Sequence, residues 1–156
     1  MLGASRSGRC ASCRDRRIVL RHLDCLVTTA AHRIFVYGTL LAGERNHRYL
    51  ASARLIGAAR TTPAFSLHDL GRYPGLVAGG EQSVVGEVYE VDEPTLAALD
   101  RLEDHPRLYQ RVAIVLADHS RVETYLLTPE QVAGHTLIVS GSWRARRKRP
   151  RRRGSR

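Results

Sequence analysis

Short apolar runs, separated by turn-forming residues, dominate the chain between residues 32 and 143. The runs are rich in β-branched and aromatic residues and are bounded by Gly, Pro, Asn and Asp, a pattern typical of β-strands. Gly86 lies inside one run and predicts a bulge or a close approach of two backbones. The predicted strands are residues 33–37, 54–62, 64–70, 76–78, 84–91, 109–116, 121–127 and 137–140.

One segment has the period of an amphipathic helix instead. Asp92 is a suitable N-cap and Pro94 is tolerated in the first turn, so we expect the helix to begin here. It runs to about Asp104 and ends before the next proline, which disfavours helix in the residue before it. Asn46 predicts the cap of a shorter helix over residues 47–53. Many short strands with one main helix predict an α+β fold, a small and partly closed mixed β-barrel with short flanking helices.

A carboxylate lies inside the apolar stripe of the main helix. At about 100° per residue, Glu103 falls between Leu96 and Leu99, on the face that the helix must bury. Burial disfavours the charged form of a carboxylate and raises its pKa toward the value that proton transfer near pH 7 requires. Glu103 is therefore a candidate general acid and base. The alternative is a glutamate at the rim of the core, in a structural ion pair with an arginine such as Arg111.

The turn at residues 37–40 follows the first predicted strand. Gly38 permits a positive φ and leaves no Cβ between the backbone and a ligand. Consecutive N–H groups in such a turn can form a small nest for an anion, and a carboxylate is a natural guest. The alternative is an ordinary turn that ends a strand, which is commoner. Taken by itself, the turn leaves both interpretations open.

The net charge of +10 is confined to the two ends of the chain. Residues 1–31 carry six Arg and two Asp, and residues 144–156 carry nine Lys or Arg and no acid, whereas residues 32–143 carry ten Arg and thirteen Asp or Glu. An acidic centre with basic ends is not the pattern of a nucleic-acid-binding fold. We expect one folded domain over residues 32–143, between a disordered basic leader and a disordered Arg-rich tail. The tail is either a solvated appendage or an arm that binds nucleic acid or an anionic membrane surface non-specifically.

The leader carries all the cysteines. Cys10, Cys13, His22 and Cys25 have the ligand types and spacing of a tetrahedral zinc site, but a chance arrangement in an Arg-rich segment is the favoured interpretation. We expect the leader to be an extension that precedes a natural start near Val27. No apolar run reaches the roughly 18 residues of a membrane helix, and no secretory cleavage pattern follows. A cysteine-free centre fits a cytoplasmic location without a membrane partner.

Five segments, in this order, resemble the γ-glutamylcyclotransferase-like family, most closely its bacterial members and its γ-glutamylamine cyclotransferase branch. The resemblance covers about residues 33–143 and leaves both basic ends unmatched. The segments are FVYGTL at 35–40, NH at 46–47, GEVYEV at 86–91, LDRLEDHPRLYQR at 99–111 and SGSW at 140–143.

This resemblance implies a mixed β-barrel with flanking helices and a site in a cavity at the barrel mouth. Glu103 falls on the family's catalytic glutamate. The turn at 37–40 falls on the loop that holds the α-amino-acid end of the substrate through backbone N–H groups. Tyr109 matches a family tyrosine near the site, and Arg111 takes a supporting role. The implied substrate-binding residues are Tyr37, Gly38, Thr39, Leu40, Tyr109 and Arg111.

The activity that the resemblance implies is cyclisation of a γ-glutamyl amide to 5-oxoproline, with release of an amine or amino acid. The expected substrates are of the γ-glutamylamine type, and neither a metal nor an organic cofactor is needed. Two alternatives stay open: a non-catalytic member of the same fold that binds a small metabolite, and a nucleic-acid-associated protein that acts through residues 144–156.

Overall fold

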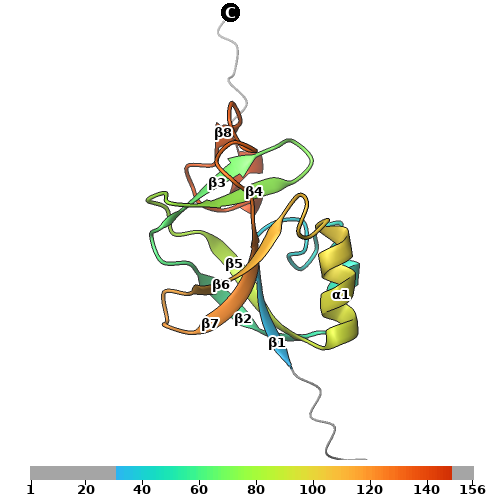
Figure 1. Ribbon diagram of the computed structural model, residues 1–156. Coiled ribbons are helices and arrows are strands. Elements are labelled where there is room, and N and C mark those ends of the chain that lie inside the picture. Colours follow the sequence, from blue (N-terminus) through green and yellow to red (C-terminus); the bar gives the residue numbers. More distant parts are fainter. Residues whose placement is uncertain (1–30, 149–156) are drawn as a thin grey trace, which may run out of the picture.

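Strands are the predominant regular secondary structure of the protein, as Figure 1 shows for a computed structural model that describes residues 31–148. One α-helix, α1 (Glu93–Leu102), and two 3-10 helices, η2 (His47–Leu50) and η3 (Arg144–Lys148), accompany them. The strands are β1 (His32–Val36), β2 (Arg54–Arg60), β3 (Phe65–Asp69), β4 (Pro74–Ala78), β5 (Val85–Val91), β6 (Gln110–Val115), β7 (Arg121–Leu126) and β8 (Thr136–Leu137).

The larger sheet has the strand order β2-β5-β1-β7-β6. Its central strand β1 is antiparallel to β5 and parallel to β7, which makes the sheet mixed. Ile34, Phe35 and Val36 of β1 are almost fully buried, as expected for an apolar strand covered on both faces. The end of β1 is therefore held rigidly in the core, and the turn that follows starts from a fixed point.

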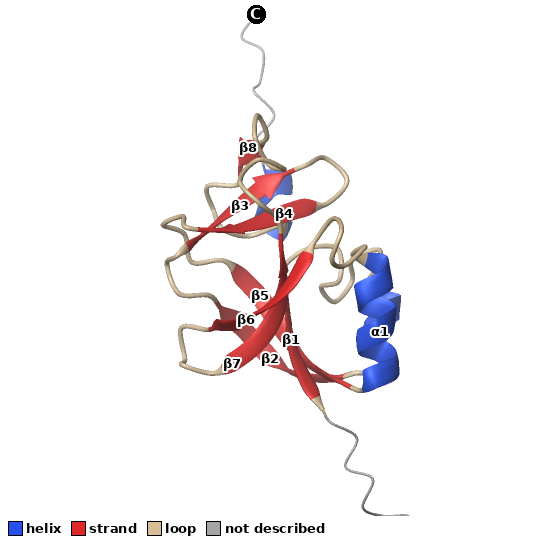
Figure 2. Ribbon diagram, in the orientation of Figure 1, coloured by secondary structure: helices blue, strands red, loops and turns tan. Residues whose placement is uncertain are grey.

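The predicted barrel is not confirmed, because the five-stranded sheet is not closed. Within the described residues its edge strands β2 and β6 meet at one bridge just beyond their ends, between Thr61 and Leu116. A separate three-stranded sheet, β4-β3-β8, lies against one end of the larger sheet (Figure 1). The N–H of Leu127 donates to the carbonyl of Leu76 at 2.9 Å and links the two sheets. The α+β class with mixed sheets and one main helix is confirmed (Figure 2).

Helix α1 begins as predicted but ends earlier. Asp92 caps it, because its Oδ1 accepts a hydrogen bond from the Thr95 N–H at 2.9 Å. The helix ends at Leu102 rather than near Asp104, since Asp104 has a φ of +50° that a helix cannot continue. Glu103 is consequently the C-cap residue, and its N–H still donates to the Leu99 carbonyl at 2.9 Å.

The expectation of close backbone approach at Gly86 is confirmed. A Cβ at this position would lie 2.2 Å from the Val36 carbonyl oxygen of the neighbouring strand. The irregular register that a bulge produces occurs elsewhere, between Leu55 and Gly57 of β2. Only glycine therefore lets β5 pass the end of β1 at this distance.

The second helix differs from its prediction, since η2 is a short 3-10 helix that ends at Leu50. Asn46 precedes it without a side-chain capping bond. Instead the Asn46 Nδ2–H donates to Thr39 Oγ1 at 3.0 Å. This asparagine therefore stabilises the glycine turn rather than the helix that follows it.

The boundary of the basic tail also differs from the prediction. Residues 144–148 form η3 rather than the start of a disordered tail. Arg144 is ion-paired with Glu87, and Arg146 is ion-paired with Asp69 and lies over the Trp143 ring. The acidic partners of these arginines are remote in the sequence, so the basic composition of residues 144–156 alone does not predict that Arg144 and Arg146 belong to the domain.

Two further features concern the described residues alone. No helix in residues 31–148 is long and apolar enough to span a membrane. In the same range no group of three or more His, Cys, Asp or Glu side chains is placed to hold a metal ion. The zinc arrangement considered for Cys10, Cys13, His22 and Cys25 lies outside the described residues.

Candidate functional site

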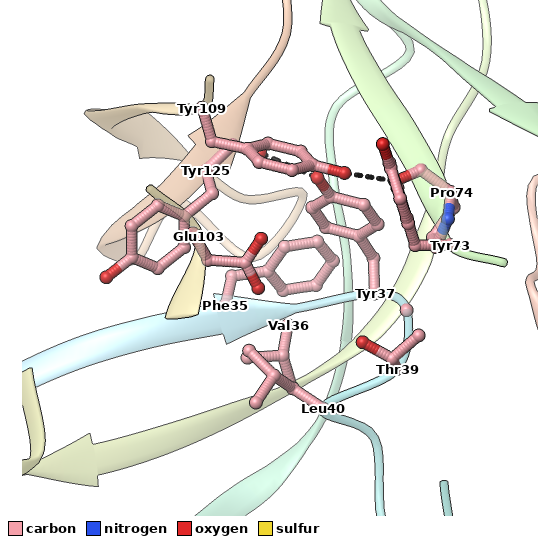
Figure 3. Close-up of a pocket in the computed structure, with 11 residues that line it drawn as sticks. Phe35, Val36, Tyr37, Thr39, Leu40, Tyr73, Pro74, Glu103, Tyr109 and Tyr125 are labelled. Carbon is pink, nitrogen blue, oxygen red and sulfur yellow. Dashed lines mark hydrogen bonds between the residues drawn. The ribbon is translucent and has the colours of Figure 1, made fainter. Parts of the chain in front are cut away.

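A pocket lies where β1 ends and the turn at residues 37–40 begins (Figure 3). Counted with its mouth, it spans about 340 Å³. The space inside it that a water-sized group can reach is only about 30 Å³, so the pocket is narrow. It is lined by residues 35–40, Tyr73, Pro74, Glu103, Tyr109 and Tyr125. The fold thus brings the glycine turn, the candidate glutamate and the three tyrosines Tyr73, Tyr109 and Tyr125 to one pocket.

Gly38 is required in this turn for a steric reason. A Cβ at Gly38 would lie 2.5 Å from Cγ and 2.8 Å from Cδ of Pro74. Gly38 is not among the glycines with positive φ, so the conformational freedom expected from the sequence is not what it provides. The missing Cβ lets the turn pass directly against Pro74, and the two together form one wall of the pocket.

Backbone donors in the turn are available to a ligand. The N–H groups of Gly38, Thr39 and Leu40 donate no hydrogen bond to any other group within residues 31–148. The turn is closed by other groups, since the Leu41 N–H donates to Gly38 O at 3.2 Å and the Asn46 N–H donates to Thr39 O at 2.9 Å. Consecutive free donors of this kind suit a carboxylate or an oxyanion.

Glu103 directs its carboxylate into the pocket, toward Phe35 and Tyr37 (Figure 3). The carboxylate makes no hydrogen bond or ion pair with any described residue. Burial raises the pKa of Glu103 from its ordinary 4.5 to about 7, with no charged partner to oppose the shift. The ion pair with Arg111, considered above as an alternative, is not formed. The group is therefore able to take and return a proton near neutral pH.

Two tyrosines present their hydroxyl oxygens as acceptors. Tyr37 donates its hydroxyl hydrogen to the Tyr125 carbonyl at 2.7 Å, and Tyr109 donates to the Pro74 carbonyl at 2.7 Å. Each phenol oxygen retains lone pairs after its hydrogen has been committed. Burial, and then the nearby Glu103 charge, raises the pKa of Tyr109, so the phenol stays neutral. Both side chains can accept a hydrogen bond from a cationic substrate group.

Arg111 does not line the pocket. Its Nε donates to Asp100 Oδ1 at 3.0 Å, and its Nη1 donates to the Glu123 carboxylate. Tyr125 donates its hydroxyl to the same Asp100 oxygen at 2.7 Å. Arg111 therefore ties α1 to β7, and it has no described contact through which it would bind substrate directly.

Five lining residues were not among the predicted site residues: Phe35, Val36, Tyr73, Pro74 and Tyr125. Tyr73 packs edge-on against Tyr109, with ring centroids 6.3 Å apart. Tyr125 sits on a strand whose alternation predicts burial but not proximity to the turn. In the sequence, Tyr73 and Pro74 are only a tyrosine and a proline before a short apolar segment. This pattern does not distinguish a pocket wall from an ordinary turn.

The sequence matches a known protein family. The family model described as "Gamma-glutamyl cyclotransferase, AIG2-like" matches residues 34–145, which is most of the chain. The chain belongs to this family. The matched range contains the glycine turn, Glu103, Tyr109 and Arg144.

Several relatives agree with this membership in the gamma-glutamyl cyclotransferase family. A Vibrio cholerae protein named "Putative gamma-glutamylcyclotransferase" is 51% identical over 112 residues, covering 72% of this chain and 95% of that protein. The Escherichia coli K12 protein named "Gamma-glutamylcyclotransferase family protein YtfP" is 37% identical over 111 residues, covering 71% and 95%.

Solved structures of the gamma-glutamyl cyclotransferase type share the fold. The solution structure of Escherichia coli ytfP superposes with a TM-score of 0.59 at 38% identity, covering 74% of this chain and 99% of that one. The crystal structure of a mouse AIG2-like protein gives a TM-score of 0.60 at 34% identity, covering 66% and 83%. The predicted family is thus confirmed at this level, and its γ-glutamylamine branch stays a prediction.

Proposed function

We propose that the protein cyclises a γ-glutamyl amide to 5-oxoproline and releases the attached amine or amino acid. The observation that carries this proposal is the pairing of Glu103, a partly buried carboxylate with a pKa of about 7, with the free N–H groups of residues 38–40 in one small pocket. Membership of the cyclotransferase family supports the same reaction class.

Substrate binding follows from the donors and acceptors in the pocket. The α-carboxylate of the γ-glutamyl group accepts hydrogen bonds from N–H groups of the turn at 38–40. Its α-ammonium lies within reach of Glu103 and donates to the phenol oxygens of Tyr37 and Tyr109. Because both tyrosine hydrogens are committed to backbone carbonyls, these oxygens favour a cation over an anion. The pocket therefore selects a zwitterionic head group.

The reaction is a proton transfer followed by ring closure. Glu103, as a carboxylate, removes one proton from the α-ammonium, and the neutral amine nitrogen forms a bond to the γ-carbonyl carbon. A free N–H of the turn stabilises the resulting oxyanion. As the oxyanion collapses, the bond between the carbonyl carbon and the leaving nitrogen breaks, and Glu103 returns its proton to that nitrogen. The regenerated Glu103 carboxylate then takes the second proton from the ring nitrogen and passes it to the departing amine, so that the products are neutral lactam and an ammonium ion. The attack is intramolecular, so a well-positioned substrate needs little further assistance.

The family branch bears on the leaving group. The resemblance implies γ-glutamylamine-type substrates, in which the departing group is an amine. No described residue of the reaction centre contacts that group in the scheme above. The pocket proper therefore selects the γ-glutamyl head and admits several leaving groups.

The test is Glu103→Gln, assayed by release of 5-oxoproline from a panel of γ-glutamyl compounds. The amide keeps the shape of the carboxylate but cannot carry the proton, so kcat falls by about 10²- to 10⁴-fold. Glu93→Gln on the same helix is the matched control, because Glu93 is an exposed residue outside the pocket. We expect its rate to equal that of the wild type.

Two results would contradict the proposal. Full activity in Glu103→Gln would remove Glu103 from the mechanism. Saturable binding of γ-glutamyl compounds by the wild type, without 5-oxoproline from any of them, would instead indicate a non-catalytic binding protein. Circular dichroism of the variant separates loss of chemistry from loss of fold.

A further inference from the structure

Two carbonyl groups of the turn at residues 37–40 are held by the short segment that follows it. The Thr39 carbonyl accepts a hydrogen bond from the Asn46 N–H at 2.9 Å, and the Leu40 carbonyl bonds His47 Nδ1 at 3.1 Å. In a trans peptide the carbonyl and the following N–H point in opposite directions. Fixing the Thr39 carbonyl therefore also fixes the direction of the free Leu40 N–H.

Asn46 acts on the turn a second time, through its side chain. Its Nδ2–H donates to Thr39 Oγ1 at 3.0 Å and occupies one lone pair of that oxygen. Within residues 31–148 the Thr39 hydroxyl donates its own hydrogen to no group, and Thr39 lines the pocket. This hydroxyl is therefore free to donate to a ligand, unlike those of Tyr37 and Tyr109, whose hydrogens are committed.

His47 connects the turn to strand β5. A carbonyl oxygen only accepts, so the bond to Leu40 places a hydrogen on His47 Nδ1. The His47 ring packs against Tyr89, with ring centroids 5.8 Å apart. The Tyr89 hydroxyl donates to Glu87 Oε2 at 3.0 Å, and the Ala42 N–H donates to the same oxygen at 2.9 Å. The turn and the loop after it are thus held by a continuous series of contacts.

We call Asn46, His47 and Glu87 the turn anchor. Only 12% of the Glu87 side chain is exposed, and none of the three residues lines the pocket. The fold brings the sequence motifs at 46–47 and 86–91 together behind the turn. The turn anchor can therefore influence a reaction in the pocket only through the turn that it holds.

We propose that Asn46 and His47 are positioning residues of the reaction, and that Asn46 makes the Thr39 hydroxyl an additional hydrogen-bond donor in the pocket. This rests on the proposed function, in which donors of the turn bind the α-carboxylate and the oxyanion. Preorganised donors are effective because they need no reorientation as charge develops. Without the turn anchor, the Leu40 N–H and the Thr39 hydroxyl lose their fixed directions and stabilise that charge less well.

The first experiment separates the loss of a hydrogen bond from the loss of a ring. His47→Leu removes the donor to the Leu40 carbonyl, whereas His47→Asn places an amide N–H near the position of Nδ1. We expect kcat for 5-oxoproline release to fall about 10- to 100-fold in His47→Leu and to return to within about fivefold of wild type in His47→Asn. Arg48→Gln is the matched control on η2, because Arg48 is exposed and lies outside the pocket.

A double-mutant cycle tests the link between Asn46 and the Thr39 hydroxyl. Asn46→Ala removes the side-chain donor but keeps the backbone N–H that binds the Thr39 carbonyl. We expect kcat/KM to fall by about three- to tenfold in Asn46→Ala and at least as much in Thr39→Val, which lacks the hydroxyl. In the Thr39→Val background, Asn46→Ala lowers it by less than about twofold further, because its target is already absent. A residue that supports only the fold would lower the rate by the same factor in both backgrounds.

The outcomes distinguish this inference from the proposed function. If His47→Leu is fully active, if His47→Asn is as impaired as His47→Leu, or if Thr39→Val leaves the effect of Asn46→Ala unchanged, the positioning role is wrong although the protein is a cyclotransferase. If the wild type yields no 5-oxoproline from any γ-glutamyl compound, the proposed function is wrong and this inference fails with it. All rates are measured below the lowest melting temperature of the set, so that unfolding does not contribute to them.

Discussion

Gly38 shows how one absent methyl group shapes the pocket. Its turn passes so close to Pro74 that a Cβ would lie 2.5 Å from the proline ring. Pro74 cannot move freely, because its carbonyl accepts the hydrogen bond from the Tyr109 hydroxyl. The same contact that closes one wall of the pocket therefore also positions an aromatic side chain in it.

We predict that Gly38→Ala destabilises the protein by about 1–3 kcal/mol, the usual effect of overpacking a rigid contact. It also lowers 5-oxoproline release, because the free N–H groups and Tyr109 shift together. Gly57→Ala is the control, since a Cβ there meets nothing within 4 Å. Thermal unfolding of both variants checks this, and equal melting temperatures would show that Pro74 yields without cost.

Glu103 links the pocket to stability as well as to chemistry. Its pKa is raised by burial, so the folded state holds this proton more tightly than the unfolded chain does. The stabilising contribution is complete below pH 4.5, declines between 4.5 and about 7, and is lost above that.

We predict that Glu103→Gln is more stable than the wild type at pH 8 by about 1–3 kcal/mol, because it removes a buried charge. The difference shrinks as the pH falls toward 4.5, the ordinary pKa of the group. Urea unfolding of both proteins at pH 5 and pH 8 measures it. A difference that does not change with pH would mean that Glu103 titrates as an ordinary exposed carboxylate.

At the scale of the elements, Arg111 is one of the strand side chains that hold α1 against the larger sheet. Arg111 of β6 donates to Asp100 of α1 and to Glu123 of β7. Asp100 lies one helical turn before Glu103 and also accepts the Tyr125 hydroxyl. This cluster sets where α1 ends relative to the sheet, and hence where Glu103 enters the pocket.

We predict that Arg111→Leu destabilises the protein by about 1–3 kcal/mol, because two partly buried carboxylates lose their partner. It lowers kcat without removing the pH dependence that Glu103 confers, since Arg111 positions the glutamate and does not contact substrate. Arg107→Leu is the control, because its pair with Asp104 is exposed and contributes little. An unchanged melting temperature in Arg111→Leu would contradict a structural role for the cluster.

Over the whole molecule, the start of the basic C-terminal segment belongs to the fold. Arg144 pairs with Glu87 beside the loop after β1, and Arg146 pairs with Asp69 at the turn between β3 and β4. Residues of both segments line one surface cavity beside Thr39. A short helix far along the chain thus connects the two sheets and the site.

We predict that the double variant Arg144→Gln and Arg146→Gln unfolds with about 1–3 kcal/mol less stability, from the loss of two ion pairs and one cation–π contact. Arg54→Gln is the control, since its pair with Glu90 is exposed. A double variant as stable as this control would show that η3 contributes nothing to the stability of the domain.

Local patterns predicted the individual elements well. Asp92 capped its helix as its side-chain chemistry requires, and Gly86 marked a close approach of two strands. Predictions that depended on distant contacts were wrong or incomplete. Asn46 bonds the glycine turn instead of capping a helix, and the sheet stays open although the strand pattern suggested a barrel. The contacts that decide these features join different elements of the chain, so the periodicity of a single element does not predict them.

The order of residues alone was enough to infer the family, the α+β class and Glu103 as a carboxylate on an apolar helix face, because capping, alternation and short motifs are local. The packing decided why Gly38 must be glycine, where Arg111 finds its partners, and that the turn at 37–40 and Glu103 share one pocket. It also made Arg144 and Arg146 part of the domain. Distances between segments remote in sequence arise only when the chain has folded, and the proposed chemistry depends on those distances.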